Sequence, residues 1–301
     1  MDFSRGRRFP SEISALLSRP PWLCAGHQES GSSGAGSGST SSGSGSGSSF
    51  VSTPALTVSG AIEGSHVFIE GRSVEIWARW CSDHEVTQIE YYNVMGSSPS
   101  NSPGLNKPVE KVSWYDAITY CNKRSLAENL TPCYKVNGNA DTNQWGNNIS
   151  GTITCDFTAD GYRLPTEAEW EYFARGGNTS NSGQTDYSGD ENIESVAWYS
   201  GNSGFQTHEV KKKAANALGL YDMTGNVWEW CWDQCYDESV IMITTSTPFD
   251  GFASGNKRVL RGGSWFNSAN DCKVFRRYMW EPNERSIQPC CGFRLVSSKS
   301  K

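Results

Sequence analysis

Residues 258–265 read RVLRGGSW, and residues 292–296 read GFRLV. Residues 266–291 lie between these two frames and read FNSANDCKVFRRYMWEPNERSIQPCC. This stretch follows neither the helical period nor the strand period, and Phe266, Tyr278 and Trp280 stand in it beside charged residues. Large apolar side chains outside an amphipathic pattern either fill a core or form a binding surface. We therefore treat residues 265–291 as the candidate ligand-binding segment, held between the two frames.

The composition limits the classes of protein that this chain can belong to. The chain has 301 residues, 36% of them hydrophobic, and a formal net charge of −6. The densest basic run, residues 211–213, is short, so we expect no nucleic-acid partner. No run of 18 apolar residues occurs, so we expect no membrane span. The twelve tryptophans predict a loop-rich fold held together by aromatic packing.

Residues 1–50 differ in composition from the rest and are predicted to be a leader and a disordered tether. Arg5, Arg7 and Arg8 resemble the basic start of a signal peptide, although Glu12 interrupts the expected apolar core. Cys24 is a candidate lipid-modified cysteine, and the Gly/Ser-rich run 31–49 is typical of a flexible tether. These features predict a lipoprotein displayed at the cell surface, with an outer-membrane anchor and an extracellular domain. An engineered linker or a misassigned start codon is the alternative.

Residues 51–301 are predicted to form one α+β domain with few helices and much irregular structure. Ser113 with Asp116, and Thr166 with Glu169, form capping boxes that predict helices over 114–127 and from 167 to Gly176. Residues 67–76 read as a β-hairpin around a Glu-Gly turn. The carboxylates of residues 167, 169 and 171 are expected to be solvated or to cap the helix.

The ten cysteines form no CxxC pair and no metal-ligand spacing with histidine. Buried free thiols are the simplest interpretation. A disulfide between Cys133 and Cys155 is the alternative. The adjacent Cys290 and Cys291 are not expected to bridge each other, because a vicinal disulfide strains the peptide between them.

Seven segments together resemble one known family. They read DHEVTQ at 83–88, YNVMG at 92–96, PVEKVSWYDA at 108–117, GYRLPTEAEWEY at 161–172, NALGLYDMTGNVWEW at 216–230, and RGGSW at 261–265 with GFR at 292–294. In this order they resemble the formylglycine-generating enzyme / sulfatase-modifying-factor domain family, over residues 67–296. The resemblance implies a C-type-lectin-like fold with a small antiparallel sheet, two helices and long ordered loops.

The resemblance also implies an oxidase chemistry that this sequence does not support. The enzymes of the family hold copper(I) with two cysteines five residues apart, which suits a soft metal. Aligned on Gly-Gly-Ser-Trp, the second cysteine falls on Cys272 but the first falls on Asn267. Because an amide is a poor ligand for copper(I), we predict a protein that is not an enzyme. A formylglycine-type oxidase acting on a sulfatase cysteine is the disfavoured alternative.

A structural calcium ion is a second feature that the resemblance implies. Its ligands would be Asp222, the carbonyl oxygens of Gly225 and Val227, and Glu229, and such oxygen ligands suit a hard cation. The alternative is that Glu229 only forms hydrogen bonds within a buried loop. No other cofactor is expected.

One branch of the family accounts for the candidate segment. Trp265, Ala269, Cys272, Val274, Arg277, Pro282, Arg285 and Gly292-Phe-Arg294 resemble the frame of the variable proteins of diversity-generating retroelements, of the treponemal type. Lys273 is the one departure, since that frame has arginine there. Such systems rewrite the positions between frame residues by mutating adenines, typically in Asn codons. Most of the intervening residues, including Phe266, Asn270 and Tyr278, are reachable in this way. Met279, Trp280, Glu281, Glu284 and Gln288 are not.

We therefore predict a binding protein with a diversified surface, whose partner is a variable protein or surface ligand and which is itself a monomer. The predicted ligand-binding residues are Phe266, Asn267, Ser268, Asn270, Asp271, Arg276, Tyr278, Met279, Trp280, Glu281, Asn283, Glu284, Ser286, Ile287 and Gln288. Rigid aromatic side chains and arginine are typical of such surfaces. The alternative for Phe275, Met279, Tyr278 and Trp280 is that they fill the core. An accessory domain of the same fold without diversity is a third possibility.

Overall fold

The computed structural model describes residues 49–54, 56–146, 148–235, 256–285 and 290–298. All of them lie in one compact unit, Ser48–Lys301. The predicted leader, Cys24 and nearly all of the predicted tether lie outside the described residues. None of the helices in the described ranges is long and apolar enough to cross a membrane.

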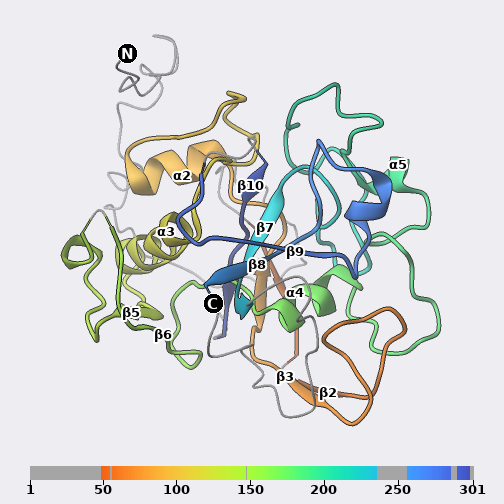
Figure 1. Ribbon diagram of the computed structural model, residues 1–301, viewed down its shortest axis with the longest axis horizontal. Helices are drawn as coiled ribbons and strands as arrows, with labels where there is room; N and C mark the ends of the chain where they lie inside the picture. The colour runs from red at the N-terminus through yellow and green to blue at the C-terminus, as the bar shows by residue number, and fades with distance from the viewer. Residues whose placement is uncertain (1–48, 55, 147, 236–255, 286–289, 299–301) are drawn as a thin grey trace, which may run out of the picture. The chain divides into compact units, whose positions relative to one another are not determined.

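A four-stranded sheet lies at the centre of this unit (Figure 1). Its strands, in spatial order, are β10 (Cys291–Gly292), β7 (Trp228–Cys235), β8 (Lys257–Arg261) and β9 (Arg277–Trp280). The pairs β7–β8 and β8–β9 are antiparallel, whereas β10 runs parallel to β7. The central sheet is therefore mixed rather than purely antiparallel. Strand β10 follows the candidate segment and pairs in parallel with Trp228 and Glu229, the first residues of β7.

Three smaller sets of strands surround the central sheet. The first is a sheet of β1 (Phe50–Ser52), β4 (Trp80–Ser82) and β11 (Val296–Ser297); the others are the pairs β2 (Leu56–Ser59) with β3 (Ser73–Ile76) and β5 (Tyr134–Val136) with β6 (Ile153–Cys155). The predicted hairpin over 67–76 is wrong. Residues 67–72 form turns, and β3 pairs instead with β2, which precedes them.

Three of the described helices begin at capping boxes, and the sequence predicts two of them. The described helices are α2 (Gln88–Met95), α3 (Trp114–Ala127), α4 (Glu167–Ala174) and α5 (Ile193–Val196), with 3-10 turns η1 (Thr142–Gln144) and η2 (Ala269–Cys272). Ser113 caps α3 and Thr166 caps α4, each with the predicted acidic partner, so both predicted helices are confirmed. The sequence prediction missed α2, although Thr87 and Glu90 form the same capping box.

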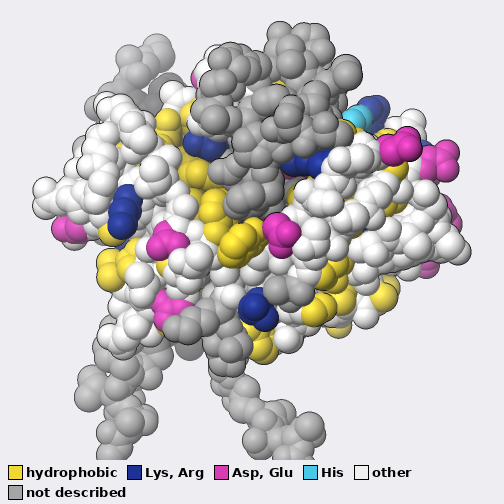
Figure 2. Space-filling view, turned by 90° about the horizontal axis from the view of Figure 1, so that it is seen from below, with side chains coloured by type: hydrophobic (Ala, Val, Ile, Leu, Met, Phe, Trp, Pro, Cys, Tyr) yellow, Lys and Arg dark blue, Asp and Glu magenta, His cyan; other side chains and the backbone are white. Residues whose placement is uncertain are grey.

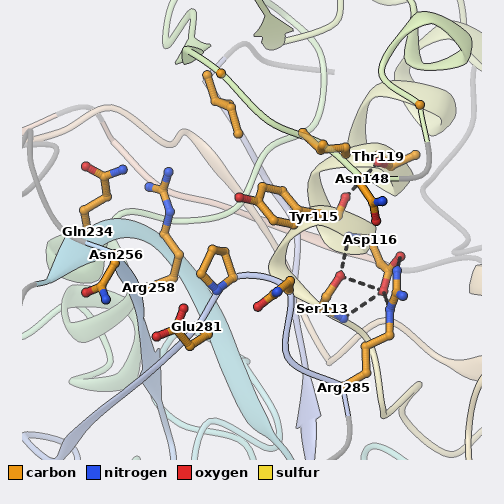
Figure 3. A pocket seen from close by; sticks show the side chains of 16 residues that line it. Ser113, Tyr115, Asp116, Thr119, Asn148, Gln234, Asn256, Arg258, Glu281 and Arg285 are labelled. Carbon is orange, nitrogen blue, oxygen red and sulfur yellow. Dashed lines mark hydrogen bonds and ion pairs between the residues drawn. The ribbon is translucent and has the colours of Figure 1, made fainter.

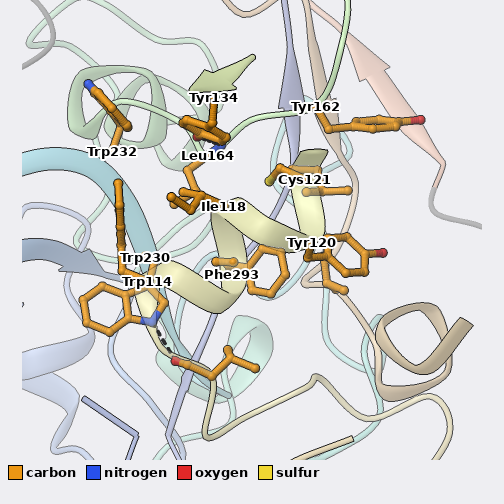
Figure 4. Close-up of a cluster of buried hydrophobic side chains, with 14 of the residues drawn as sticks. Trp114, Ile118, Tyr120, Cys121, Tyr134, Tyr162, Leu164, Trp230, Trp232 and Phe293 are labelled. Carbon is orange, nitrogen blue, oxygen red and sulfur yellow. Dashed lines mark hydrogen bonds between the residues drawn. The ribbon is translucent and has the colours of Figure 1, made fainter. Parts of the chain in front are cut away.

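The central sheet has an aromatic face and a charged face. Trp228, Trp230 and Trp232 of β7 point to the side of α3, where the Trp230 indole donates to the Val112 carbonyl oxygen at 2.9 Å (Figure 4). The other face packs against α4. The fold is thus α+β, with few helices, small sheets and long ordered loops, as the sequence predicts.

Buried ion pairs join α4 to β8 and β9. Glu167 and Glu171 are fully buried, and Arg261 of β8 approaches both of them. Arg277 of β9 binds Glu167 through two nitrogen atoms, with 2.7 Å between Nε and Oε1. Glu169 caps α4 and also pairs with Arg163. The expectation that these carboxylates are solvated is therefore wrong, because their partners come from distant parts of the chain.

The surface carries charges of both signs. On the face that Figure 2 shows, acidic and basic side chains are interspersed, and hydrophobic side chains reach the surface between them. A continuous basic stripe, which would mark a nucleic-acid interface, is not seen on that face.

Candidate functional site

The frame residues of the candidate segment are tied to the scaffold. Trp265, Cys272 and Val274 are buried. Arg277 is held by Glu167 of α4, and Arg285 binds Asp116 of α3 through two nitrogen atoms at 2.6 Å. Gly263 has a positive φ of 77°, and a β-carbon on it would lie 2.5 Å from the Cys272 sulfur. Glycine is therefore required where this turn closes over the buried thiol.

The side chains between the frame residues are displayed to different degrees. Six of the predicted ligand-binding residues are exposed: Phe266, Ser268, Asn270, Arg276, Glu281 and Asn283. Five are partly buried: Asn267, Asp271, Tyr278, Trp280 and Glu284. Ser286, Ile287 and Gln288 lie outside the described residues. Buried and displayed side chains alternate closely along the segment. A loop can display side chains in this way when its frame residues supply the packing against the scaffold.

Met279 is the exception among the predicted ligand-binding residues. It is only 4% exposed and lies in the core cluster that α4 covers. Side chains alternate along a strand, so Met279 and Arg277 point to the charged face of the sheet while Tyr278 and Trp280 point to the aromatic face. We therefore assign Met279 to the scaffold and leave it out of the candidate surface. Phe275 is partly buried against the turn at Gly64.

A line of contacts connects the two ends of the displayed segment. The amide oxygen of Asn267 accepts a hydrogen bond from the Trp228 indole at 2.9 Å. The Trp228 and Tyr278 rings lie 5.7 Å apart, and Tyr278 and Trp280 lie 5.3 Å apart. Such ring distances are those of favourable aromatic pairs. The displayed residues of the turn after β8 and those of β9 thus form one continuous surface over Trp228.

A recess of about 820 Å³ lies beyond the end of β9 (Figure 3). The displayed Glu281 and Asn283 line one side of it, and Tyr115 of α3 and Arg258 of β8 line it as well. Burial lowers the pKa of Arg258 to about 10. The Arg285–Asp116 ion pair lies at the other side, where Asp116 also accepts a hydrogen bond from Ser113. This recess is large enough for a small ligand or for a side chain of a partner protein.

Phe205 is a candidate surface residue that the sequence analysis missed. It is 79% exposed, the highest value among the large hydrophobic side chains that are described as exposed, and its φ is +61°. Its backbone N–H donates to the Ser203 hydroxyl, which itself donates to the Trp265 carbonyl oxygen at 2.8 Å. Ser203 therefore links the backbone at Phe205 to that at Trp265, the residue before the displayed Phe266, which is 46% exposed. A bulky residue in the left-handed region is an outlier that suggests a functional reason.

The two positions implied for copper ligands do not form a metal site. The Asn267 amide oxygen accepts hydrogen bonds from the Ser264 hydroxyl at 2.5 Å and from Trp228. Cys272 is fully buried, and burial raises the pKa of its thiol to about 12. A buried neutral thiol beside an engaged amide lacks the two thiolates that copper(I) needs.

The residues predicted to hold calcium are engaged in other interactions. Arg294 binds Glu229 with two contacts of 2.6 Å, and the Trp170 indole donates to the same carboxylate at 2.7 Å. The Asp222 carboxylate accepts the Lys211 backbone N–H, and burial raises its pKa to about 6. Within the described ranges, no group of three His, Cys, Asp or Glu side chains is arranged to hold a metal ion. The Glu229 carboxylate is thus engaged by Arg294 and Trp170, as the alternative from the sequence expects, and the calcium ion stays a prediction.

The cysteines of the described residues are all thiols. Cys133 and Cys155, for which a disulfide was the alternative, are both in this state. They lie near the β5–β6 pair, in or beside the aromatic core cluster. This result agrees with the interpretation of buried thiols.

The geometry defines a class of protein: a lectin-like scaffold of small sheets and long ordered loops, with an exposed segment over a row of tryptophans. Residues 66–299 match the model of the sulfatase-modifying factor enzyme 1-like domain. The chain belongs to this family, and its fold is the C-type-lectin-like fold that the sequence predicts.

Two similar proteins match over most of their length. Treponema denticola variable protein 1, a solved structure, is 38% identical, with a TM-score of 0.70 over 83% of this chain and 95% of that protein. Chaperone protein LppX of Paenibacillus barcinonensis is 37% identical over 265 residues, which are 81% of this chain and 89% of LppX. The formylglycine-generating enzyme of Streptomyces coelicolor is 37% identical over 184 residues, but these are 57% of this chain and 46% of the enzyme. In sequence, the similarity to LppX thus extends further along both chains than the similarity to this enzyme.

Proposed function

We propose that this protein is a non-enzymatic binding protein that displays a diversified ligand-binding surface on a rigid scaffold. The observation that carries the proposal is the division of residues 265–285. Most frame side chains are buried or paired with α3 and α4, and most of the intervening ones are exposed or partly buried. Substitution of the displayed residues would leave the packing of the scaffold almost unchanged.

The proposed surface has an aromatic part and a polar part. Phe266, Tyr278 and Trp280 supply large rigid side chains, which bury much area on binding at a low cost in side-chain entropy. Glu281 and Asn283 border the polar recess. A partner protein or surface ligand with a mixed apolar and polar face fits this arrangement. The name of the relative LppX, a chaperone, agrees with a protein-binding role.

The source of the variation is proposed to be a diversity-generating retroelement, on the basis of the similarity to the treponemal variable protein. Sequencing of the gene from several isolates tests this proposal. We expect substitutions to concentrate at the displayed positions of 266–290 and to arise at template adenines. Substitutions spread evenly along residues 51–301 would refute it, and identical sequences in all isolates would favour an accessory domain without diversity.

An enzyme assay separates the proposed binding protein from an oxidase. The full chain, loaded with copper(I), is incubated with a peptide that contains Cys-x-Pro-x-Arg, and aldehyde formation is measured. We expect no aldehyde, because an amide and a buried neutral thiol occupy the two ligand positions. Aldehyde formation that is lost in Cys272→Ser would overturn the proposal. A family enzyme with both cysteines serves as the positive control.

We further propose that the domain is a monomer displayed at the cell surface, with a lipid on Cys24 as the anchor. The long Gly/Ser-rich tether would let a domain reach a partner away from the membrane. Expression of the full chain with Cys24→Ala as the matched control tests this proposal. Accessibility of the wild-type domain to external protease, together with release of the variant from the membrane fraction, is the expected result.

A further inference from the structure

Cys290 and Cys291 form a pair of adjacent thiols that the proposed binding function does not use. Their sulfur atoms lie 4.0 Å apart. Cys290 is buried, at 7% exposure, whereas Cys291 is partly exposed. The pair therefore combines a buried residue with a partly exposed one.

The backbone holds both residues in place. Cys291 is paired with Trp228 in the parallel β10–β7 ladder. The carbonyl oxygen of Cys290 accepts the Trp228 backbone N–H at 2.6 Å. A disulfide needs sulfur atoms about 2.05 Å apart, and between adjacent residues it also strains the peptide. The two residues are thus fixed in a geometry that favours a dithiol over a disulfide.

Two thiolates at this distance suit a soft ion. Thiolate ligands select soft cations, and metal–sulfur bonds are about 2.3 Å long. Sulfur atoms 4.0 Å apart would then subtend an angle of roughly 120° at an ion between them, and a separation greater by about 0.6 Å would make the arrangement linear. Because the described residues offer no third His, Cys, Asp or Glu ligand in a metal-binding group, four-coordinate zinc does not fit.

Charges of both signs lie near Cys291, and the carboxylates of Glu110 and Glu284 act against its thiolate form. Cys291 borders a small cleft together with Lys111, Arg285 and Glu284. Two of these three charged side chains are cations. Arg285 is already paired with Asp116, so Lys111 is the cation that would offset part of the single negative charge left when two thiolates bind a monovalent cation.

We propose that Cys290 and Cys291 form a two-thiolate site for a soft monovalent cation, of which silver(I) is the probe. Both thiols lose their protons to solvent, the cation forms two bonds to sulfur, and no oxidation is involved. This pair is distinct from positions 267 and 272, where the resemblance places metal ligands. It also does not depend on the identity of the partner, since neither cysteine is among the predicted ligand-binding residues.

Titration of the purified full chain with silver(I), followed by native mass spectrometry and competition with a chromophoric chelator, tests the proposal. We expect one tightly bound ion in the wild type and in the control variants Cys272→Ser and Cys155→Ser. Cys290→Ser and Cys291→Ser should each lose it, with circular dichroism spectra like that of the wild type. An ion that persists in the double variant, or that is lost in Cys272→Ser, would overturn the proposal.

A second measurement does not depend on the folding of any variant. Bound silver(I) should protect residues 290 and 291 of the wild type from alkylation by iodoacetamide, as mapped by peptide mass spectrometry. Equal alkylation with and without the ion, after a bound ion has been counted, would place the ion elsewhere and refute the site.

Discussion

Met279 and Glu281 lie two residues apart, and replacement with asparagine should strongly destabilise the protein at residue 279 but not at residue 281. Met279 is in the core cluster beneath α4 and is paired with Val259 of β8, whereas Glu281 is exposed. Loss of the methionine packing costs about 2–5 kcal/mol. A buried amide without a partner adds about 1–3 kcal/mol. Met279→Asn should therefore lower the free energy of unfolding by about 3–8 kcal/mol.

Urea denaturation followed by tryptophan fluorescence measures this difference. Domains are commonly stable by about 5–15 kcal/mol, so Met279→Asn should remove a large part of that stability and lower the urea midpoint. Met279→Ala should lower the free energy of unfolding by about 2–5 kcal/mol, and it serves as a folded variant for comparison in the same assay. Glu281→Asn should change the free energy of unfolding by less than about 0.5 kcal/mol. A cost below about 1 kcal/mol for Met279→Asn would show that residue 279 is displayed and would refute the division into frame and surface.

Three further predictions concern residues outside that comparison. Phe205→Gly should raise the free energy of unfolding by about 0.5–1 kcal/mol in urea denaturation, since glycine relieves the strain of a φ of +61°. A lower free energy of unfolding in this variant would show that the backbone at Phe205 is not strained. Arg277→Met should lower the free energy of unfolding by about 3 kcal/mol in the same assay, because it leaves the buried Glu167 with one cation fewer. An unchanged free energy of unfolding would contradict the pairing. Burial lowers the pKa of His84, but hydrogen bonds to Asp83 and Glu90 outweigh it and raise the pKa to about 9. Thermal denaturation should show this contribution, on the order of 3 kcal/mol, in full below pH 6.5 and lost as the pH rises through about 9; His84→Gln should abolish that dependence.

Local signals in the sequence predict local structure well. The capping boxes at Ser113 and Thr166 predict where α3 and α4 begin, because the cap and its acidic partner are three residues apart. The same signal at Thr87 would have predicted α2. The hairpin over 67–76 fails for the opposite reason, since strand pairing depends on residues 56–59, which no local pattern identifies.

Burial of charge could not be predicted from the sequence around it. Glu167 and Glu171 resemble the exposed face of a helix, and they are buried only because Arg261 and Arg277 come from β8 and β9. The same applies to Glu229, where pairing with Arg294 uses the carboxylate that a calcium site would need. Interactions between distant segments therefore decided which of the candidate polar residues belong to the scaffold.

Asn267 stands where the resemblance places a copper-ligating cysteine, and its amide bears on both the metal chemistry and the aromatic part of the proposed surface. A cysteine at this position would supply a soft ligand but could not match the two hydrogen bonds that the amide oxygen accepts from Ser264 and Trp228. These bonds tie the Gly-Gly-Ser-Trp turn to β7 and fix the Trp228 ring on which Tyr278 packs. In the proposed function, an amide in place of a thiol would remove the metal chemistry and would stabilise the aromatic platform. Because a rigid platform lowers the entropy cost of binding, this exchange favours a binding surface over a catalytic pocket.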